Sequence, residues 1–453
     1  MLLNVTASRS SNLLANPLTI DTIDISAKTI GDLILVRTFV QDRITTSKIA
    51  ADLGISTGVL HPVFEELRQK RYFDVHGLVG DEYSFSLTTE GRSHAQRRME
   101  RCSYNGVAPV TLERYREVVD MQKPRLSITK EGVRRAFADL VVSEKMVDQI
   151  GPAFATQRSI FFYGPTGNGK TSIAERLVRL YTDAVVVPYA IEVDNQIITV
   201  FDPTVHQPLA HQPSGLDPRW VACRRPLVIT GGELEASMLQ LKRDASTGIY
   251  SAPLQMRANN GILMIDDFGR QLIAPDAMLN RWIVPLEKRI DYLALEYGLS
   301  FSIPFELLVV FSTNLEPRKL GDDAFFRRIQ NKVYIGPMTA AEFDEVALRT
   351  AEDMGIDISF GALEFLQDVC LRHGADMLRA CYPRDLFRLV KVICEYEGRP
   401  ITLTADVMER AASLYFTVDG QPMGQIGLKG MAAEERAATE PQRAPAIAGL
   451  RLV

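Results

Sequence analysis

The pattern of apolar and polar residues near the start of the chain is that of a small helical module with a hairpin. From Ala27 onward, apolar residues recur every three or four positions, which predicts a helix. The same spacing predicts two more helices over 47–53 and 57–70. Two alternating runs, 72–75 and 83–87, then predict a β-hairpin, because alternation places every second side chain on one face.

A different pattern follows beyond the first hundred residues. Short, almost wholly apolar runs at 159–163, 261–265 and 307–312 alternate with amphipathic helical stretches. Such runs are typical of strands in a parallel sheet that helices cover on both faces. From 337 to 418 the pattern is helical throughout. We therefore predict an α/β domain followed by a helical domain.

These patterns divide the chain into six segments. The first three helices and the hairpin resemble a winged helix-turn-helix domain, and the last segment is rich in Gly, Ala, Pro and Glu. The predicted segments are an irregular arm (1–26), a winged-helix-like domain (27–104), a linker (105–126), the α/β domain (127–336), the helical domain (337–418) and a disordered tail (419–453).

The composition is that of an average globular protein. Hydrophobic residues make up 46% of the 453 residues and charged residues 24%, which excludes a wholly disordered chain or a small disulfide-stapled fold. No apolar run approaches the roughly 18–20 residues that a membrane-spanning helix needs. The five cysteines contain no CxxC pair, so neither a disulfide framework nor a zinc site is indicated. Since no signal-peptide pattern opens the chain, we expect a cytoplasmic protein without a membrane span.

A candidate phosphate-binding loop lies directly after the first apolar run of the α/β domain. It matches the pattern GxxxxGK[ST] and precedes an amphipathic helix, which is the context that such a loop requires. Glycines let backbone N–H groups approach the phosphates, the lysine reaches the β- and γ-phosphates, and the threonine hydroxyl ligates Mg²⁺. The predicted nucleotide-binding residues are Gly164, Pro165, Thr166, Gly167, Asn168, Gly169, Lys170 and Thr171, with Ser172 in the helix that follows.

Two acidic residues end the second apolar run. Ligands of open α/β sheets bind at the carboxyl ends of the strands, so Asp266 and Asp267 are expected beside the phosphates. We assign Asp266 to the Mg²⁺ ion, together with Thr171, and Asp267 to the water that attacks the phosphate. The expected cofactors are therefore ATP or ADP and Mg²⁺.

These motifs, taken with Asn314 at the end of the third apolar run, resemble those of AAA+ ATPases. The resemblance implies a P-loop AAA+ parallel sheet with a helical lid domain and hydrolysis of ATP to ADP and phosphate. It also implies that Asn314 is a first sensor that helps to position the water. Arg327 or Arg328 would be an arginine finger that acts on the neighbouring subunit, and Arg384 a second sensor of the lid.

The resemblance also carries expectations about assembly and rate. A site completed by a neighbour implies a homo-oligomer, and a ring of six is the family's usual form. The family usually has Glu where this chain has Asp267. Because the aspartate stem is one methylene shorter, it holds the water less well, and slow turnover is expected.

Two predicted hairpins, 188–199 and 291–304, extend the α/β domain. The second precedes the Asn314 strand, where AAA+ proteins of the enhancer-binding and MoxR type carry an inserted hairpin. Ile249 and Tyr250 lie where the enhancer-binding proteins have a loop that engages their target. Two interpretations remain open: these residues line a central pore, or they pack inside the insert.

A loop after the first of these hairpins contains two histidines, His206 and His211. Their spacing places them off a shared helical face, and no third ligand is near in the sequence. A solvent-exposed loop is therefore favoured over a metal site.

The charge of the winged-helix-like domain bears on its partner. The whole chain has a net charge of -5, and residues 1–104 hold twelve basic and twelve acidic residues. A DNA-binding module normally has a basic face. The helix at 57–70 offers His61, Glu65 and Glu66, a weak set of base readers. Protein docking is therefore the favoured role of this domain. Nucleic-acid binding remains an alternative, because arginines after the hairpin could still contact phosphates.

Three functions fit these patterns. The first is an oligomeric ATPase, similar to bacterial AAA+ proteins with a fused winged helix, that couples ATP binding and hydrolysis to the remodelling of a protein partner. The second is a DNA-bound AAA+ loader or regulator. The third is a nucleotide-controlled scaffold with little turnover.

Overall fold

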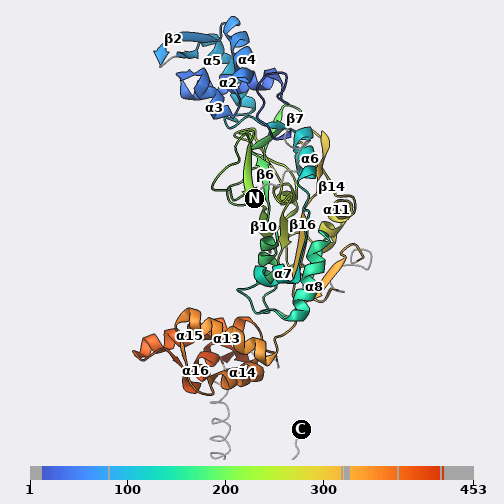
Figure 1. Cartoon of the computed structure of the whole chain (residues 1–453), viewed down its shortest axis with the longest axis vertical. Coiled ribbons are helices and arrows are strands. Elements are labelled where there is room, and N and C mark those ends of the chain that lie inside the picture. Colours follow the sequence, from blue (N-terminus) through green and yellow to red (C-terminus); the bar gives the residue numbers. More distant parts are fainter. Residues whose placement is uncertain are drawn as a thin grey trace, which may run out of the picture. The chain divides into compact units, whose positions relative to one another are not determined.

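The structure is a computed structural model that describes residues 13–79, 82–317, 320, 327–374, 377–418 and 421–422. The chain forms two compact units (Figure 1). The first comprises Met1–Ala138, Glu144–Gly164 and Lys170–Tyr334, and the second comprises Asp139–Ser143, Pro165–Gly169 and Ile335–Val453. None of the described helices combines the length and apolar character that a bilayer crossing needs.

The first unit contains a five-stranded parallel sheet, here called the main sheet. Its central strands are buried except at Tyr163, as short apolar runs predict for a sheet covered on both faces. The three strands predicted in the α/β domain are present, and each lies within one residue of its predicted bounds. The strand order is β10 (Leu227–Thr230), β13 (Ile262–Ile265), β16 (Leu308–Thr313), β5 (Ile160–Tyr163) and β17 (Asn331–Tyr334).

Helices pack around the main sheet. On α11 (Pro275–Lys288), the ring of Trp282 meets Phe305 and Phe311 edge-on, with ring centroids 5.8 and 6.3 Å apart. The helices of this region are α7 (Lys130–Ala136), α8 (Glu144–Ala155), α9 (Lys170–Arg176), α10 (Leu254–Arg257) and α11 (Pro275–Lys288), with short 3₁₀ turns at Leu177–Leu180 and Ala236–Leu239.

A second sheet, here called the inserted sheet, is built from segments between the elements of the main sheet and from the predicted linker. The predicted hairpin at 188–199 is present and turns at Asp194 and Asn195, whose φ angles are 48° and 60°. The predicted linker supplies an edge strand, β4, and the helix α6 (Leu112–Met121). The strand order is β11 (Lys242–Arg243), β12 (Tyr250–Ser251), β8 (Gln196–Thr199), β7 (Ala190–Val193) and β4 (Val110–Thr111).

Two further strand pairs complete this region. β6 (Ala184–Pro188) pairs with β9 (Trp220–Arg224). β14 (Ile290–Ala294) and β15 (Ser300–Pro304) form the hairpin predicted at 291–304, which turns at Gly298 with a φ of 92° that favours glycine. This hairpin leads into β16, as the sequence pattern predicts.

The N-terminal module has the helices and the hairpin that the apolar pattern predicts. Its helices begin at Ser or Thr residues whose hydroxyls accept a backbone N–H from three residues on. Residues 13–26 are irregular, yet Leu14 is buried in the core of the inserted sheet. The elements are α2 (Ala27–Gln41), β1 (Ile44–Thr45), α3 (Thr46–Leu53), α4 (Thr57–Gln69), β2 (Phe73–Val79), β3 (Glu82–Leu87) and α5 (Thr89–Arg101).

The N-terminal module is docked on the inserted sheet. Ala190 and Ile197, from β7 and β8, belong to the same apolar cluster as the module's own core. The Thr29 hydroxyl donates to Glu192 Oε1 at 2.8 Å. The Ala108 N–H donates to the Leu53 carbonyl at 2.8 Å. Module and sheet therefore share one buried interface.

Arg219 joins the arm, the predicted linker and the insert in one buried charge network. Its side chain is 1% exposed and binds both carboxylate oxygens of Asp217. It also donates to Asp24 at 2.6 Å and to the Pro109 carbonyl at 3.2 Å. Burial alone would raise the pKa of Asp24, but the Arg219 charge and the hydrogen bonds to the carboxylate lower it below its usual value.

The second unit is the predicted helical domain. Helices account for most of its described residues, as the apolar pattern predicts, and the first begins with a capping box between Thr339 and Glu342. The disordered tail predicted at 419–453 lies outside the described residues except for 421–422. The elements are α13 (Ala340–Met354), β18 (Asp357–Ile358), α14 (Ala362–His373), α15 (Cys381–Glu397), β19 (Thr402–Leu403), α16 (Ala405–Tyr415), β20 (Thr417–Val418) and β21 (Gln421–Pro422).

Candidate nucleotide-binding site

The predicted phosphate-binding loop follows β5 and runs into α9. Gly164, Gly167 and Gly169 have φ angles of 142°, 82° and 79°, which glycine adopts without the steric cost of a side chain. Within the loop, Asn168 is buried and its amide reaches the Pro165 carbonyl at 3.5 Å. Thr166 is exposed at the tip and Ser172 is half-buried in the first turn of α9. The backbone therefore has the curved form that a phosphate cradle requires.

Lys170 opens α9 and is only 8% exposed. Its ammonium group donates to the Gly164 carbonyl at 2.9 Å. Burial lowers the pKa of this ammonium group, and the negative charges of Asp266 and Asp267 oppose that decrease. A charge in a site that is partly shielded from solvent interacts more strongly with a phosphate than it would in bulk water.

The next side chain of α9 meets the acidic end of β13. The Thr171 hydroxyl donates to Asp266 Oδ2 at 2.7 Å. The Asp266 backbone N–H is in turn held by the Thr230 carbonyl of the neighbouring strand β10 at 2.8 Å. Residues 95 positions apart in the sequence are thus in contact, as the two motifs predict.

Asp267 has an unusual backbone conformation. Its φ is 48°, in the left-handed region that costs most residues about 1–2 kcal/mol, although Asp and Asn enter it more readily. Its side chain is exposed, and its N–H donates to Asp266 Oδ1 at 3.0 Å. Gln271, which the sequence did not single out, donates its amide to the carbonyls of Asp266 and Asp267 at 2.8 and 3.1 Å.

Asn314 follows β16, which lies between β13 and β5 in the main sheet. This order puts Asn314 between the strand that leads into the phosphate loop and the strand that ends in the two aspartates. Its Oδ1 atom is buried, and among the described residues no group donates a hydrogen bond to it. Buried polar atoms are normally paired, so this oxygen suits an added donor such as a water.

These residues fit a Mg²⁺–nucleotide. Mg²⁺ prefers oxygen ligands and keeps several waters and substrate phosphates beside one or two protein groups. Thr171 and Asp266 would hold the ion, which neutralises phosphate charge when bound. The described residues contain no group of three or more His, Cys, Asp or Glu that could hold a metal by themselves. A metal bound mainly by the nucleotide is therefore the form that this donor set supports.

The three arginine candidates lie on different elements. Arg327 is exposed and Arg328 is half-buried just before β17, in the first unit. Arg384 is exposed in the first turn of α15, in the second unit. The arginine-finger candidates and the second-sensor candidate therefore belong to different units of the chain.

Within the second unit, two residues that the sequence did not single out contact the loop. The Cys381 N–H, at the start of α15, donates to the Gly167 carbonyl at 3.0 Å. A methyl group added to Gly167 would lie 3.5 Å from Arg379 Cδ. The guanidinium of Arg379 also stacks over the Tyr382 ring at 5.6 Å. No local motif distinguishes these residues, because the contact joins distant parts of the chain.

The structure corrects one expectation about the insert and settles an open choice. His206 is not in a solvent-exposed loop: its ring is buried, and its Nδ1 accepts the Asp202 N–H at 2.9 Å. Tyr250 is 2% exposed in the core of the inserted sheet, and its hydroxyl accepts the Glu296 N–H at 3.2 Å. Ile249 packs against the N-terminal cluster. Both residues therefore pack the insert and do not line a pore.

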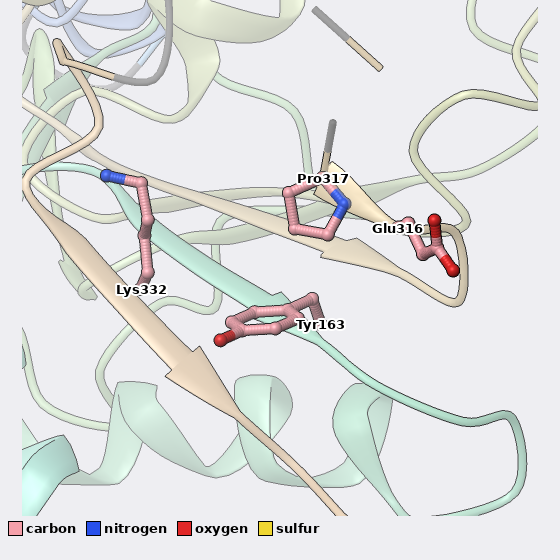
Figure 2. A pocket seen from close by; sticks show the side chains of 4 residues that line it. All are labelled: Tyr163, Glu316, Pro317 and Lys332. Carbon is pink, nitrogen blue, oxygen red and sulfur yellow. The ribbon is translucent and has the colours of Figure 1, made fainter. Parts of the chain in front are cut away.

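A hollow of about 390 Å³ lies beside the strand that enters the phosphate loop. Figure 2 shows the ring of Tyr163 between Lys332 and Glu316, with Pro317 opposite. Lys332 donates to the Ile329 carbonyl at 2.7 Å. None of the predicted phosphate-binding residues lines this hollow.

Comparison with known proteins gives a partial match to one family and a wider likeness of fold. The family described as "Domain of unknown function (DUF8689)" matches residues 339–414, which lie in the second unit. No curated protein matches the chain.

Three solved structures illustrate the likeness of fold. The RuvB Holliday junction branch migration motor of Thermotoga maritima has 15% identity and a TM-score of 0.36 over 70% of this chain and 80% of that one. NtrX from Brucella abortus has 14% identity and a TM-score of 0.40 over 67% and 62%. The FIGL-1 AAA domain has 15% identity and a TM-score of 0.35 over 71% and 95%. Likeness this distant carries no argument about function.

The fold is that of a P-loop α/β domain with a parallel sheet. The main sheet is parallel, its first strand leads into the glycine loop, and its acidic strand lies two places away with the Asn314 strand between them. A helical domain follows, with four helices among its described residues. This confirms the parallel P-loop sheet and the helical domain that the motifs predict, whereas the winged-helix character of the N-terminal module stays a prediction.

Proposed function

We propose that the chain is an oligomeric AAA+ ATPase that couples ATP binding and hydrolysis to the remodelling of a protein partner. The contact between the Thr171 hydroxyl and the Asp266 carboxylate, at 2.7 Å, carries this proposal. It joins the end of the phosphate loop to the acidic strand, where a hydrated Mg²⁺ and the terminal phosphates would bind.

Residues of the first unit have separate roles in the proposed hydrolysis. Lys170 balances the negative charge of the phosphates. Asp267 accepts a proton from the attacking water, and Asn314 holds that water through its unpaired amide oxygen. Holding the water in line with the phosphate accounts for most of the rate in such a site, because phosphoryl transfer needs little covalent help from the protein.

The proposal includes a site shared between copies of the chain. Arg327 is exposed, so it is better placed than the half-buried Arg328 to reach a neighbouring copy. Mixing two inactive variants, Lys170→Ala and Arg327→Ala, should then restore part of the activity, because some sites receive both native residues. A mixture with no more activity than its components would contradict the shared site.

A protein partner is favoured over DNA by the N-terminal module. Recognition helices contact bases with their first residues. In this chain the Leu18 carbonyl lies against Gly58, in the first turn of α4, with no room for even a methyl group. Arg98 pairs with Asp32 at 3.0 Å, and Arg92 pairs with Asp42, so a carboxylate already offsets each positive charge that would otherwise be available to neutralise a phosphate.

The hairpin β14–β15 offers a surface for such a partner. Tyr292 is 60% exposed and Tyr297 is 55% exposed. Exposed tyrosines are common in protein-binding surfaces, because one rigid side chain supplies both apolar area and a hydroxyl. Salt-sensitive DNA binding by the full chain would instead support the alternative of a DNA-bound loader or regulator.

Phosphate release by the full-length chain with ATP and Mg²⁺ tests the enzymatic claim. Lys170→Ala should lower the rate by at least about 100-fold, the usual effect of removing one donor from a charge-stabilising site. Lys288→Ala, at the exposed last turn of α11, is the matched control and should hydrolyse at the native rate. Equal rates in all three proteins would contradict the proposal and leave a nucleotide-controlled scaffold.

A further inference from the structure

A side-chain amide and one backbone hydrogen bond close the loop that carries the two aspartates. The backbone bond runs from the Arg270 N–H to the Asp267 carbonyl at 3.0 Å. Gln271 Nε2 donates to the Asp266 carbonyl at 2.8 Å and to the Asp267 carbonyl at 3.1 Å. Its Oε1 atom accepts the Gly269 N–H at 2.8 Å. One half-buried amide therefore uses both of its donor hydrogens and its acceptor on the backbone between 266 and 269.

The two carbonyls belong to the peptide planes on either side of Asp267. The relative orientation of these planes sets φ and ψ at this residue. In extended backbone, successive carbonyls point to opposite sides, whereas in helical backbone of either hand they point the same way. One NH₂ group can reach both carbonyls only when they point the same way. The amide of Gln271 thus disfavours an extended conformation at Asp267 and fits the observed left-handed one, whose φ is 48°.

The residues beside Asp267 are fixed independently of Gln271. Asp266 N–H donates to Thr230 of β10 at 2.8 Å. Phe268 N–H donates to the Ser312 carbonyl of β16 at 2.7 Å, and the Thr313 hydroxyl donates to the Phe268 carbonyl at 2.8 Å. Since both neighbours are anchored on adjacent strands, the brace acts mainly on the direction of the Asp267 side chain.

We propose that Gln271 is a positioning residue that holds Asp267 in the left-handed conformation from which its carboxylate meets the attacking water. The inference rests on the proposed ATPase function. It also accounts for the presence of Asp267 where the AAA+ family usually has Glu, because Asp enters the left-handed region more readily than Glu. The aspartate is thus matched to its backbone, and Asp267→Glu should not raise turnover above the native rate.

Steady-state phosphate release by the full-length chain tests the proposal. Gln271→Ala removes the brace, and Gln271→Glu keeps its size but removes both donor hydrogens. Each should lower kcat about 10–100-fold, because small misplacements of a reacting group are costly. The affinity for ATP and the KM should stay within about twofold of native. Arg270→Ala, an exposed neighbour in the same loop, is the control and should keep the native kcat.

A second background separates positioning from a merely structural effect. Asp267→Asn removes the base, so adding Gln271→Ala to it should cause little further loss of kcat. Equal fold losses in the native and Asp267→Asn backgrounds would overturn the proposal, and so would a native kcat in Gln271→Ala. A faster Asp267→Glu variant would overturn it as well. If the native chain releases no Lys170-dependent phosphate, the ATPase proposal fails first and the inference fails with it.

Discussion

The carboxyl edge of the main sheet and the interface under the N-terminal module treat buried polar groups in opposite ways. At the interface, the guanidinium of Arg219 is bound by Asp217, Asp24 and a backbone carbonyl. At the sheet edge, the buried oxygen of Asn314 receives no hydrogen bond from any described residue. Buried polar groups with hydrogen-bond partners specify how the chain packs. A buried polar atom without a partner instead suits a bound water or ligand. The first region maintains the fold, and the second is where we propose that the attacking water binds.

The largest expected effect comes from breaking the interface. Arg219→Leu leaves the carboxylates of Asp217 and Asp24 without their cation, so the free energy of unfolding should fall by about 3–5 kcal/mol. Denaturant titration of the full chain measures this loss. Arg97→Leu, an exposed change on α5, should have little effect. A loss below about 1 kcal/mol in Arg219→Leu would mean that the network contributes less than its burial indicates.

The converse experiment removes the unpaired oxygen at the sheet edge. Asn314→Ala should lower the hydrolysis rate about 100-fold, equivalent to about 2.7 kcal/mol in the barrier. It should not lower the melting temperature, because the deleted oxygen makes no hydrogen bond among the described residues. If the variant loses stability and keeps its rate, the contrast between the two regions is wrong.

A smaller effect is expected where the hairpin β14–β15 meets the inserted sheet. Tyr250→Phe removes the hydroxyl that accepts the Glu296 N–H and should cost about 0.5–1.5 kcal/mol of stability. Because the ring is buried, hydrolysis should stay native. Thermal unfolding and phosphate release measure the two quantities. A loss of ATP hydrolysis without a loss of stability would instead indicate that Tyr250 takes part in the ATPase cycle.

The smallest effect concerns a buried carboxyl at the interface. Burial raises the pKa of Glu192 above its usual value, so the folded chain favours the neutral form. The stability that this group contributes is present at acidic pH and is lost as the pH rises through the raised pKa. Glu192→Gln should therefore melt slightly higher than native at pH 8. The difference should shrink as the pH falls toward the usual pKa of a glutamate, and a constant difference would contradict this account.

The main sheet and the phosphate loop could be predicted because their signals are local. Apolar runs mark β5, β13 and β16, and each of the two motifs that meet in the contact between Thr171 and Asp266 is a run of consecutive residues. The role of Gln271 could not be predicted, since its effect depends on a left-handed turn with no sequence signature.

The interface under the N-terminal module was also beyond sequence reasoning. Arg219 and Asp24 lie 195 residues apart, and no periodicity reports such a pairing. Tyr250 was ambiguous for a related reason, because an exposed loop and a packed strand of two residues give the same short pattern.

The strand β4 has a practical consequence for dividing the protein. It is the edge strand of the inserted sheet and pairs in parallel with β7. A fragment that begins at residue 127 would lack β4, so the edge of β7 that β4 covers would be unpaired. Unpaired edges of this kind recruit strands from other molecules, so such a fragment is expected to aggregate. A soluble fragment that contains the proposed ATPase site would need to begin before Val110 and so retain β4 and the rest of the predicted linker.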